Sequence, residues 1–353
     1  MFQPNFTISS KILNNLTKIA EIKAVVERSK ILPKRESLLR RSAIIKMAHT
    51  STSIEGNLLA EFEVKKVLAG KKINASQKQI LEVLNYEKAL LAINNLSQGQ
   101  KFPQKKDILA LHRIVTKNLV DREKCGAFRK EPIYIVNVNH GKEKIAYTAP
   151  AAPRVPKLLD ELVSWLKLPP AKNLHPILSS GLLHYQFVTI HPFTDGNGRV
   201  ARLLTLGHLY QHRYDFRKIL VLEEYYNNNR KAYYQALQTG KTYLERENAN
   251  LTGWLEYFVE GFLSEAQRVK DKIASLGFDK KIKISDQVFL DKDEIKIMDF
   301  LSTVGKLTSQ DVVDILDISK RSAQGKLKSL LQKSLLVKKG RGPSTFYLLN
   351  TKT

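Results

Sequence analysis

The chain has 353 residues, of which 43% are hydrophobic and 26% are charged. At roughly 100–200 residues per domain, this length predicts two or three domains, and the composition excludes a disordered, collagen-like or disulfide-stapled chain. Lys and Arg outnumber Asp and Glu by 58 to 34, a formal charge of +24. This excess favours an anionic partner such as nucleic acid, a nucleotide or an acidic protein face, with a merely solubilising surface as the alternative.

Three features of the sequence bear on where the protein acts. The single cysteine, Cys125, cannot form an internal disulfide, which fits a reducing compartment. The first five residues, Met-Phe-Gln-Pro-Asn, lack the basic start and apolar stretch of a secretory signal. No segment has the roughly 18 consecutive apolar residues that a membrane span needs. We therefore expect a cytoplasmic protein without a membrane partner.

Helical periodicity dominates the first part of the chain, where apolar side chains recur every three or four residues. Helices are predicted over 12–26, 38–48, 76–96 and 105–120. We expect an N-terminal helical region over 1–100 and a second, catalytic domain over 101–276.

A short β-pattern interrupts the helices. Residues 133–138 are β-branched and aromatic, and Asn-His-Gly at 139–141 separates them from a second run ending at residue 147, which predicts a β-hairpin. After a proline-rich stretch, helices are predicted over 157–168, 174–188, from 199 onward, 228–238 and 251–276.

The last part of the chain predicts a separate small domain. A linker over 277–288 breaks the periodicity, and 289–353 then has the pattern of a winged helix-turn-helix. Its helices are predicted over 293–301, 309–316 and 319–332, and its strands over 335–339 and 344–349. From residue 318 to 353 there are nine Lys or Arg and no Asp or Glu. This charge favours DNA binding, with protein docking or a solvated lysine-rich face as the alternatives.

One segment concentrates residue types that bind phosphate: residues 191–202 are His-Pro-Phe-Thr-Asp-Gly-Asn-Gly-Arg-Val-Ala-Arg. Gly196 and Gly198 let the backbone approach a ligand closely and turn its N–H groups toward an anion. A helix that begins here adds the positive end of its dipole. Arg199 and Arg202 lie on one face of that helix, and cations in a first turn cost about 0.3–1 kcal/mol each, which indicates an anion for them to bind.

Asp195 and His191 supply the remaining chemistry. Asp195 offers the oxygen ligand that Mg²⁺ prefers, and His191 titrates near neutrality and can take a proton from a hydroxyl. Phe193, between them, is expected to be a buried anchor of the loop. The alternative is a plain Gly-Asn-Gly turn between two helices, with both arginines bound to neighbouring carboxylates.

The segment is similar, at every fixed position, to the signature HPFxDGNGRxxR of the Fic family of nucleotidyltransferases, and the resemblance extends over about 38–263. It implies a mainly α fold, in which a helical-bundle core carries a β-hairpin flap and is followed by the C-terminal winged helix-turn-helix. It further implies that His191 deprotonates a Ser, Thr or Tyr hydroxyl of a target protein. The hydroxyl attacks the α-phosphate of ATP, AMP is transferred and pyrophosphate leaves.

The same resemblance assigns the other residues of the motif. Asp195 would coordinate Mg²⁺. Asn197, with the backbone from Gly196 through Gly198 to Arg199, would hold the phosphates, and Arg199 and Arg202 would bind the β- and γ-phosphates.

Residues 50–57, Thr-Ser-Thr-Ser-Ile-Glu-Gly-Asn, suggest a brake on this activity. Gly56 or Asn57 predicts a helix end, which places Glu55 in the last turn, where the dipole disfavours a carboxylate. Contact with Arg202 would relieve both unfavourable placements, with Ser51 bracing the pair. The stretch resembles the inhibitory motif of many Fic proteins, whose glutamate occupies the γ-phosphate space, and implies an inhibitory helix over about 44–56. An ordinary polar capped helix is the alternative.

Two further assignments follow from the resemblance. A target-docking flap is implied at Ile133, Tyr134, Ile135 and Val136, where an extended target segment adds as a strand, with a purely structural hairpin as the alternative. The segment 229–234 is similar to the family's adenine-side segment, so Tyr233 and Tyr234 are candidates for the base pocket, although neighbouring tyrosines on a helix are more often core.

We therefore predict an autoinhibited protein adenylyltransferase. Two alternatives stay open: a DNA-binding regulator whose core senses nucleotide without turnover, and an enzyme that removes AMP from a modified protein, with Glu55 orienting water. The intact His191 and Asp195 favour the first prediction. The expected partners are ATP with Mg²⁺ and a target protein, with the chain itself as one candidate target. DNA at the winged helix and a second copy of the chain in a homodimer are further candidates.

Overall fold

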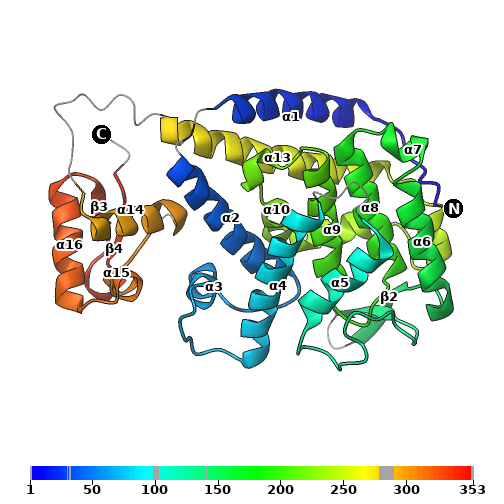
Figure 1. Cartoon of the computed structure of the whole chain (residues 1–353), viewed down its shortest axis with the longest axis horizontal. Coiled ribbons are helices and arrows are strands. Elements are labelled where there is room, and N and C mark those ends of the chain that lie inside the picture. The colour runs from blue at the N-terminus through cyan, green and yellow to red at the C-terminus, as the bar shows by residue number, and fades with distance from the viewer. Residues whose placement is uncertain are drawn as a thin grey trace. The chain divides into compact units, whose positions relative to one another are not determined.

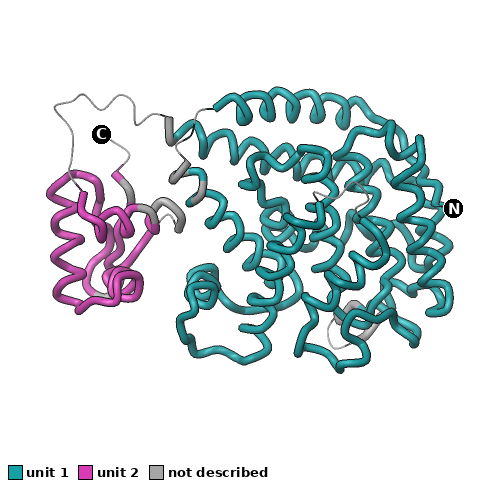
Figure 2. The backbone as a smooth tube through the Cα atoms, in the orientation of Figure 1, with its two compact units in different colours: residues 1–275 teal, residues 276–353 magenta. Residues whose placement is uncertain are grey.

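The computed structural model of the chain describes residues 2–29, 31, 33–97, 103–139, 142–277, 290–304 and 306–350 (Figure 1). The chain forms two compact units, residues 1–275 and 276–353 (Figure 2). The boundary predicted at residue 100 stays a prediction, and nearly all of the predicted linker, from 278 onward, lies outside the described residues.

The first unit is helical apart from one small hairpin, as the sequence predicts. Its elements are α1 (Ser10–Arg28), α2 (Pro33–Ile54), α3 (Glu61–Leu68), α4 (Gln77–Leu96), α5 (Lys105–Thr116), β1 (Tyr134–Asn139), β2 (Lys142–Thr148), α6 (Val155–Trp165), α7 (Pro169–Lys172), α8 (Pro176–Ile190), α9 (Asn197–Gln211), α10 (Leu222–Asn228), α11 (Arg230–Leu237), α12 (Tyr243–Glu247) and α13 (Thr252–Gly277).

α8 and α9 form the centre of this unit. Nearly all their residues are buried, because α9 packs on α8 while α6 covers α8 and α2, α4 and α5 pack against α9. α1 lies along α13 (Figure 1), where Ser9 Oγ donates to Glu256 and Lys11 pairs with Glu260. The apolar face predicted for α1, from Ile12 to Val26, is buried.

Three local features differ from the sequence prediction. α5 ends at Thr116 rather than near residue 120, because the Thr116 hydroxyl donates back to the His112 carbonyl and Asn118 has a φ of 59°. The helix predicted over 228–238 is broken at Asn229, whose side chain caps α11 by accepting from the Ala232 amide at 3.0 Å. α3 was not predicted at all.

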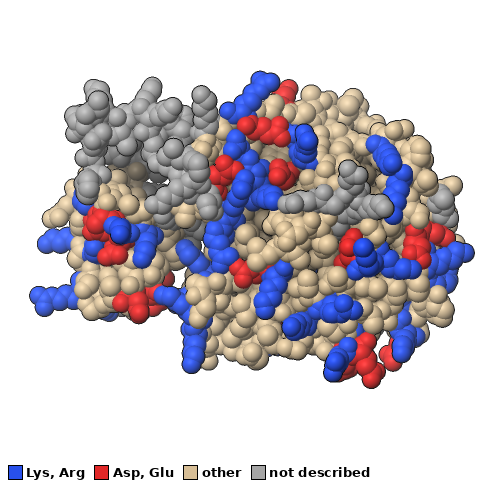
Figure 3. All heavy atoms as spheres, in the orientation of Figure 1, with Lys and Arg blue, Asp and Glu red and all other residues tan. Residues whose placement is uncertain are grey.

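Basic and acidic side chains are interspersed over the face of the first unit shown in Figure 3. Mixed charge of this kind is typical of a solvated surface. Within the part of the chain that the structure describes, each helix is too short or too polar to cross a bilayer.

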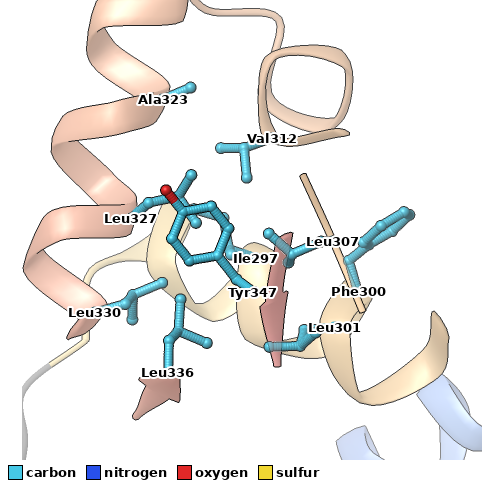
Figure 4. Close-up of a cluster of buried hydrophobic side chains, with 10 residues drawn as sticks. All are labelled: Ile297, Phe300, Leu301, Leu307, Val312, Ala323, Leu327, Leu330, Leu336 and Tyr347. Atoms are coloured by element: carbon cyan, nitrogen blue, oxygen red, sulfur yellow. The ribbon is translucent and has the colours of Figure 1, made fainter. Parts of the chain in front are cut away.

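The second unit has three helices followed by two strands, in the predicted order. They are α14 (Lys292–Val304), α15 (Ser309–Leu316), α16 (Lys320–Gln332), β3 (Leu336–Lys339) and β4 (Phe346–Leu349). β3 and β4 are antiparallel, and Tyr347 also exchanges both backbone hydrogen bonds with Leu307. Side chains from all three helices and both strands meet in one core (Figure 4). The assignment of this unit as a winged helix-turn-helix stays a prediction.

Candidate active site

The turn between α8 and α9 is built around Gly196 and Asn197. α9 begins at Asn197 because the preceding Gly196 has a φ of 81°, which a side chain would disfavour. Asn197 closes the turn on itself, since its Nδ2 donates to the Phe193 carbonyl at 2.7 Å and its Oδ1 accepts from the Phe193 amide at 2.9 Å. The turn thereby makes the amino end of α9 a candidate anion site.

Both arginines of the motif are buried in α9, with 2% of Arg199 and 3% of Arg202 exposed. The expectation that both lie in the first turn is wrong for Arg202, which is the sixth residue of a helix that begins at Asn197. Nη2 of Arg199 donates to Asp195 Oδ1 at 2.9 Å, whereas its Nε and Nη1 are buried without an acceptor among the described residues. A buried cation with unpaired donors gains most from an anion, so Arg199 marks a place for one.

His191 has the protonation state of a general base. It follows α8 in the left-handed region, with φ of 49° and ψ of 61°, a strain of about 1–3 kcal/mol that is common at functional sites. Its Nδ1 lies 3.2 Å from the Val188 carbonyl, which can only accept, so Nδ1 carries the proton and Nε2 is free to take one. Burial lowers the pKa of His191 to about 4, so the imidazole is neutral at pH 7.

Arg129 fixes the backbone around His191, and the sequence analysis missed it. Its buried guanidinium donates to the carbonyls of His191 at 2.8 Å and Glu131 at 2.9 Å. It also donates to the Pro150 carbonyl at 2.5 Å, and the Arg129 amide donates to the Pro192 carbonyl at 3.0 Å. Arg129 therefore ties the segments on either side of the hairpin to the loop that carries His191.

His112, also missed, supports the other side of the loop together with Phe193. Their rings stack at 3.7 Å, and Phe193 is fully buried, as predicted for an anchor. Nδ1 of His112 accepts from the Gly126 amide at 2.9 Å, so its Nε2 carries the proton and donates to the Asp195 carbonyl at 3.0 Å. Burial lowers the pKa of His112 to about 4, which keeps the ring neutral in this role.

The Asp195 carboxylate is the candidate metal ligand and is 46% exposed. Burial acts to raise its pKa, but the charge of Arg199 and the Gly196 amide outweigh that effect and lower the pKa, so Asp195 is ionised at neutral pH. Among the described residues, no three His, Cys, Asp or Glu gather as metal ligands. The donor set of one ionised, accessible carboxylate fits a Mg²⁺ ion that takes its other ligands from phosphate oxygens and water.

The Glu55 carboxylate reaches the same anion site from α2. Arg202 Nη2 donates to Glu55 Oε1 at 2.7 Å, and Arg202 Nε donates to Ser51 Oγ at 2.7 Å. The contact between these three residues, expected from the sequence, is thus present. A Cβ added at Gly198 would collide with Glu55 Oε1, so the carboxylate lies directly on the backbone of the first turn of α9.

Gly56 closes the end of α2, as predicted, but α2 ends at Ile54, so Glu55 lies one residue beyond the last turn in which it was expected. Gly56 has a φ of 96°, and the Asn57 amide donates to the Thr52 carbonyl at 3.1 Å, which is the closure of a Schellman motif. Glu55 therefore lies at the negative end of α2, where its charge is disfavoured until a cation meets it.

The two candidate base-pocket tyrosines face different ways. Tyr233 is 2% exposed, its hydroxyl is 2.8 Å from His184 Nε2, and its ring stacks on Tyr226, so it has the contacts of a core side chain. Tyr234 is 50% exposed, with its hydroxyl 3.5 Å from the Ile54 carbonyl at the end of α2. In this structure Tyr234 is accessible to a nucleotide and Tyr233 is not.

The predicted flap is the β1–β2 hairpin, whose turn residues at 140 and 141 lie outside the described residues. Tyr134 and Val136 are exposed by 53% and 43%, whereas Ile133 and Ile135 are partly buried. The Thr148 amide of β2 donates to the Lys241 carbonyl at 2.8 Å, so the outer edge of β2 is partly occupied. Among the described residues, β1 is thus the strand with the more open edge, and its role in target docking stays a prediction.

Residues 102–209 match the model of the Fic/DOC family. The protein named "Protein adenylyltransferase Fic" from Aedes aegypti is 32% identical over 171 residues, which cover 46% of this chain and 32% of that protein. The protein of the same name from Drosophila virilis is 30% identical over 218 residues, or 56% of this chain and 42% of that protein. The chain thus spans less than half the length of either relative.

A crystal structure of a Fic family protein from Desulfovibrio desulfuricans G20 is 25% identical, with a TM-score of 0.64 over 100% of this chain and 99% of that one. That likeness extends the match beyond the motif to the arrangement of the helices. Together with the signature at 191–202, it identifies residues 102–209 as a domain similar to the Fic/DOC family.

Proposed function

We propose that this chain is an autoinhibited protein adenylyltransferase, which transfers AMP from ATP to a Ser, Thr or Tyr hydroxyl of a protein and releases pyrophosphate. The observation that carries the proposal is that two kinds of group occur together at this site. His191 is neutral and can accept a proton, and the buried Arg199 has guanidinium donors left for an anion. Nucleotidyl transfer needs little covalent chemistry from the protein beyond positioning, a base and absorption of negative charge. The names of the relatives agree with this activity.

The chemistry proceeds from these side chains. His191 Nε2 accepts the proton of the target hydroxyl as its oxygen bonds to the α-phosphorus of ATP. The bond between that phosphorus and the oxygen bridging to the β-phosphate breaks, and pyrophosphate leaves with the electron pair. Arg199 and Arg202, with the backbone at Gly196–Gly198, bind the charge that develops on the leaving group.

Asp195 would hold the divalent ion, for which we propose Mg²⁺. When bound, such an ion neutralises phosphate charge and stabilises the departing pyrophosphate. The contribution of this chain is to keep Asp195 ionised and oriented through Arg199 and the Gly196 amide. The nucleotide base is proposed to lie near the exposed Tyr234, and an extended target segment is proposed to pair with the open edge of β1.

Inhibition follows from the place that the Glu55 carboxylate occupies. It accepts a hydrogen bond from Arg202 and lies against Gly198, in the space that a phosphate bound at the amino end of α9 would need. Two anions cannot share that space, so productive ATP binding requires Glu55 to move away.

The test uses the full chain as wild type, Glu55→Gly, and Glu55→Gly with His191→Ala, each incubated with Mg²⁺ and ATP labelled at either the α- or the γ-phosphate. We expect retention of the α-label, on the chain itself or on proteins of a cell extract, to be strongest in Glu55→Gly and lost with His191→Ala. Retention of the γ-label would indicate kinase chemistry instead. Equal α-label in wild type and Glu55→Gly would contradict the brake.

Removal of AMP is the second candidate, because Glu55 is 29% exposed beside the cradle and can orient a water. If wild type releases α-label from protein modified by Glu55→Gly, and Glu55→Gly does not, removal is the activity of the inhibited form. A cytoplasmic location and a homodimer stay predictions from the sequence.

A further inference from the structure

The charges of the second unit are divided along its sequence and across its surface. All its acidic residues precede residue 318, while residues 318–353 carry nine Lys or Arg. Two lysines, one in α16 and one directly after it, are neutralised within the unit. Lys326 lies 2.8 Å from Asp291 Oδ2, and Lys333 lies 2.7 Å from Glu294 Oε2. These ion pairs define the side of α16 that faces the start of α14.

A different side of α16 is exposed and basic. Ala323, Leu327 and Leu330 point into the core (Figure 4), which leaves a stripe at three- and four-residue spacing on the outer surface. The stripe consists of Arg321, Gln324, Gly325 and Lys328, all exposed. We call these four residues the outer face of α16.

Gly325 has no packing role in this face. A Cβ added there would meet no atom within 4 Å, and glycine inside a helix is less favourable than alanine. Within the folded chain, no contact at this position compensates for the lower stability that glycine brings. A bare position between Arg321 and Lys328 does allow another molecule to approach the helix backbone closely.

A second basic segment follows directly in the chain. Lys338, Lys339 and Arg341 are exposed at the end of β3 and in the turn after it. Among the described residues of this unit, no large hydrophobic side chain is exposed. The surface therefore lacks the apolar anchors on which protein interfaces depend, whereas clustered Arg and Lys with Gln are typical of nucleic-acid readers.

We propose that the second unit binds duplex DNA, with the outer face of α16 in the major groove and the β3–β4 turn on the phosphate backbone. The major groove is wide enough to admit an α-helix, and Arg and Gln can read base edges there. Gly325 lets the helix lie close to the groove floor. This function is independent of the nucleotidyl transfer proposed for the first unit.

The test is fluorescence anisotropy of labelled DNA duplexes titrated with the full chain at several salt concentrations. If the six exposed cations Lys320, Arg321, Lys328, Lys338, Lys339 and Arg341 all contact phosphates, the logarithm of the affinity falls with the logarithm of salt concentration with a slope of about −5. Lys328→Ala should reduce that slope by about 1. Lys326→Ala, a matched loss of charge from the same helix, should leave the slope unchanged because Lys326 is already paired.

Gly325→Leu separates a binding role from a structural one. Because the added side chain meets only open space, thermal stability should be kept or raised, while DNA affinity should fall at least about tenfold. The proposal is overturned if duplex binding is absent at 50 mM salt, if Lys326→Ala and Lys328→Ala weaken it equally, or if Gly325→Leu binds as wild type does. Capture of an acidic protein without DNA binding would instead assign the face to protein docking.

Discussion

The end of α2 is held by more than the contact between Glu55 and Arg202. Arg230, the first residue of α11, donates from Nη2 to Ser53 Oγ at 2.7 Å, and Ser53 is buried. Its Nε donates to Asn227 Oδ1 at 2.9 Å, which orients the guanidinium. Arg230 therefore holds α2 at Ser53, two residues before Glu55, and Arg230→Ala should weaken the proposed inhibition.

The size of the effect follows from this one hydrogen bond. A hydrogen bond to a charged group contributes about 1.5–3 kcal/mol when buried, and we take about 1–2 kcal/mol here because Arg230 is only partly buried. This corresponds to roughly a 5–30-fold shift toward the open state. Arg230→Ala should thus raise AMP incorporation by up to that factor, less than Glu55→Gly, which removes the blocking carboxylate itself.

The assay is the initial rate of α-label incorporation in four proteins: wild type, Arg230→Ala, Glu55→Gly and the double variant. A residue that acts only through the brake has no effect once Glu55 is gone, so the double variant should match Glu55→Gly. Ser53→Ala should reproduce the increase, because it removes the same hydrogen bond from the other side. Lys231→Ala, an equal loss of charge from an exposed neighbour, should not.

Two results would refute this reasoning. If Arg230→Ala lowers the rate in the Glu55→Gly background, Arg230 binds substrate instead of holding α2. If it leaves the rate of the wild-type chain unchanged, the hydrogen bond to Ser53 does not contribute to the closed state.

Three further predictions concern pH and the support of the loop. In Glu55→Gly, kcat/KM should keep its value down to about pH 5 and fall only toward pH 4. The reason is that the pKa of His191 is about 4, and the base is lost only when the ring takes a proton. A fall of kcat/KM centred at the usual histidine pKa of 6.5 would contradict this. Burial lowers the pKa values of His184 and His208 to about 3, so below pH 6.5 these histidines bind protons in the unfolded chain before they do in the folded one. The free energy of unfolding from urea titrations should therefore be about 2 kcal/mol lower per histidine at pH 5 than at pH 6.5. An unfolding free energy that does not change over this range would show that these rings are charged when folded. Arg129→Ala should lower the free energy of unfolding by about 3 kcal/mol or more in the same titrations, and it should lower activity in the Glu55→Gly background. Arg129→Lys should restore neither stability nor activity, because one ammonium cannot reach three carbonyls. Recovery by lysine would show that Arg129 acts only through its charge.

Much of the site was predictable because its information is local. The glycine turn, both arginines and His191 lie within twelve residues. The helix end at Gly56 could be predicted because glycine is the residue that most readily adopts a left-handed φ. The contact between Glu55 and Arg202 could be predicted even across 147 residues of sequence, because the Glu55 carboxylate is disfavoured at the end of α2 and needs a cation. The matching argument for Arg202 does not hold, since Arg202 lies in the second turn of α9.

The missed residues have no such local signature. Arg129 binds only backbone carbonyls, and His112 holds a loop more than 80 residues away, so nothing in their neighbouring sequence distinguishes them from other arginines and histidines. Tyr233 and Tyr234 show the same limit, since adjacent positions on α11 point to the core and to solvent. Only packing against α8, through His184, decides which is which.

The unequal burial of Arg202 and Glu55 indicates which of the two would move if the proposed inhibition is relieved. The Arg202 side chain is 2% exposed and also bound to Ser51, so withdrawing it would leave a buried cation without partners, whereas Glu55 is 29% exposed and can turn into solvent. The cation therefore stays in place and exchanges one anion for another. The proposed inhibition is then a competition between the Glu55 carboxylate and a phosphate for Arg202, and its strength depends on how firmly α2 and α11 hold that carboxylate beside the arginine.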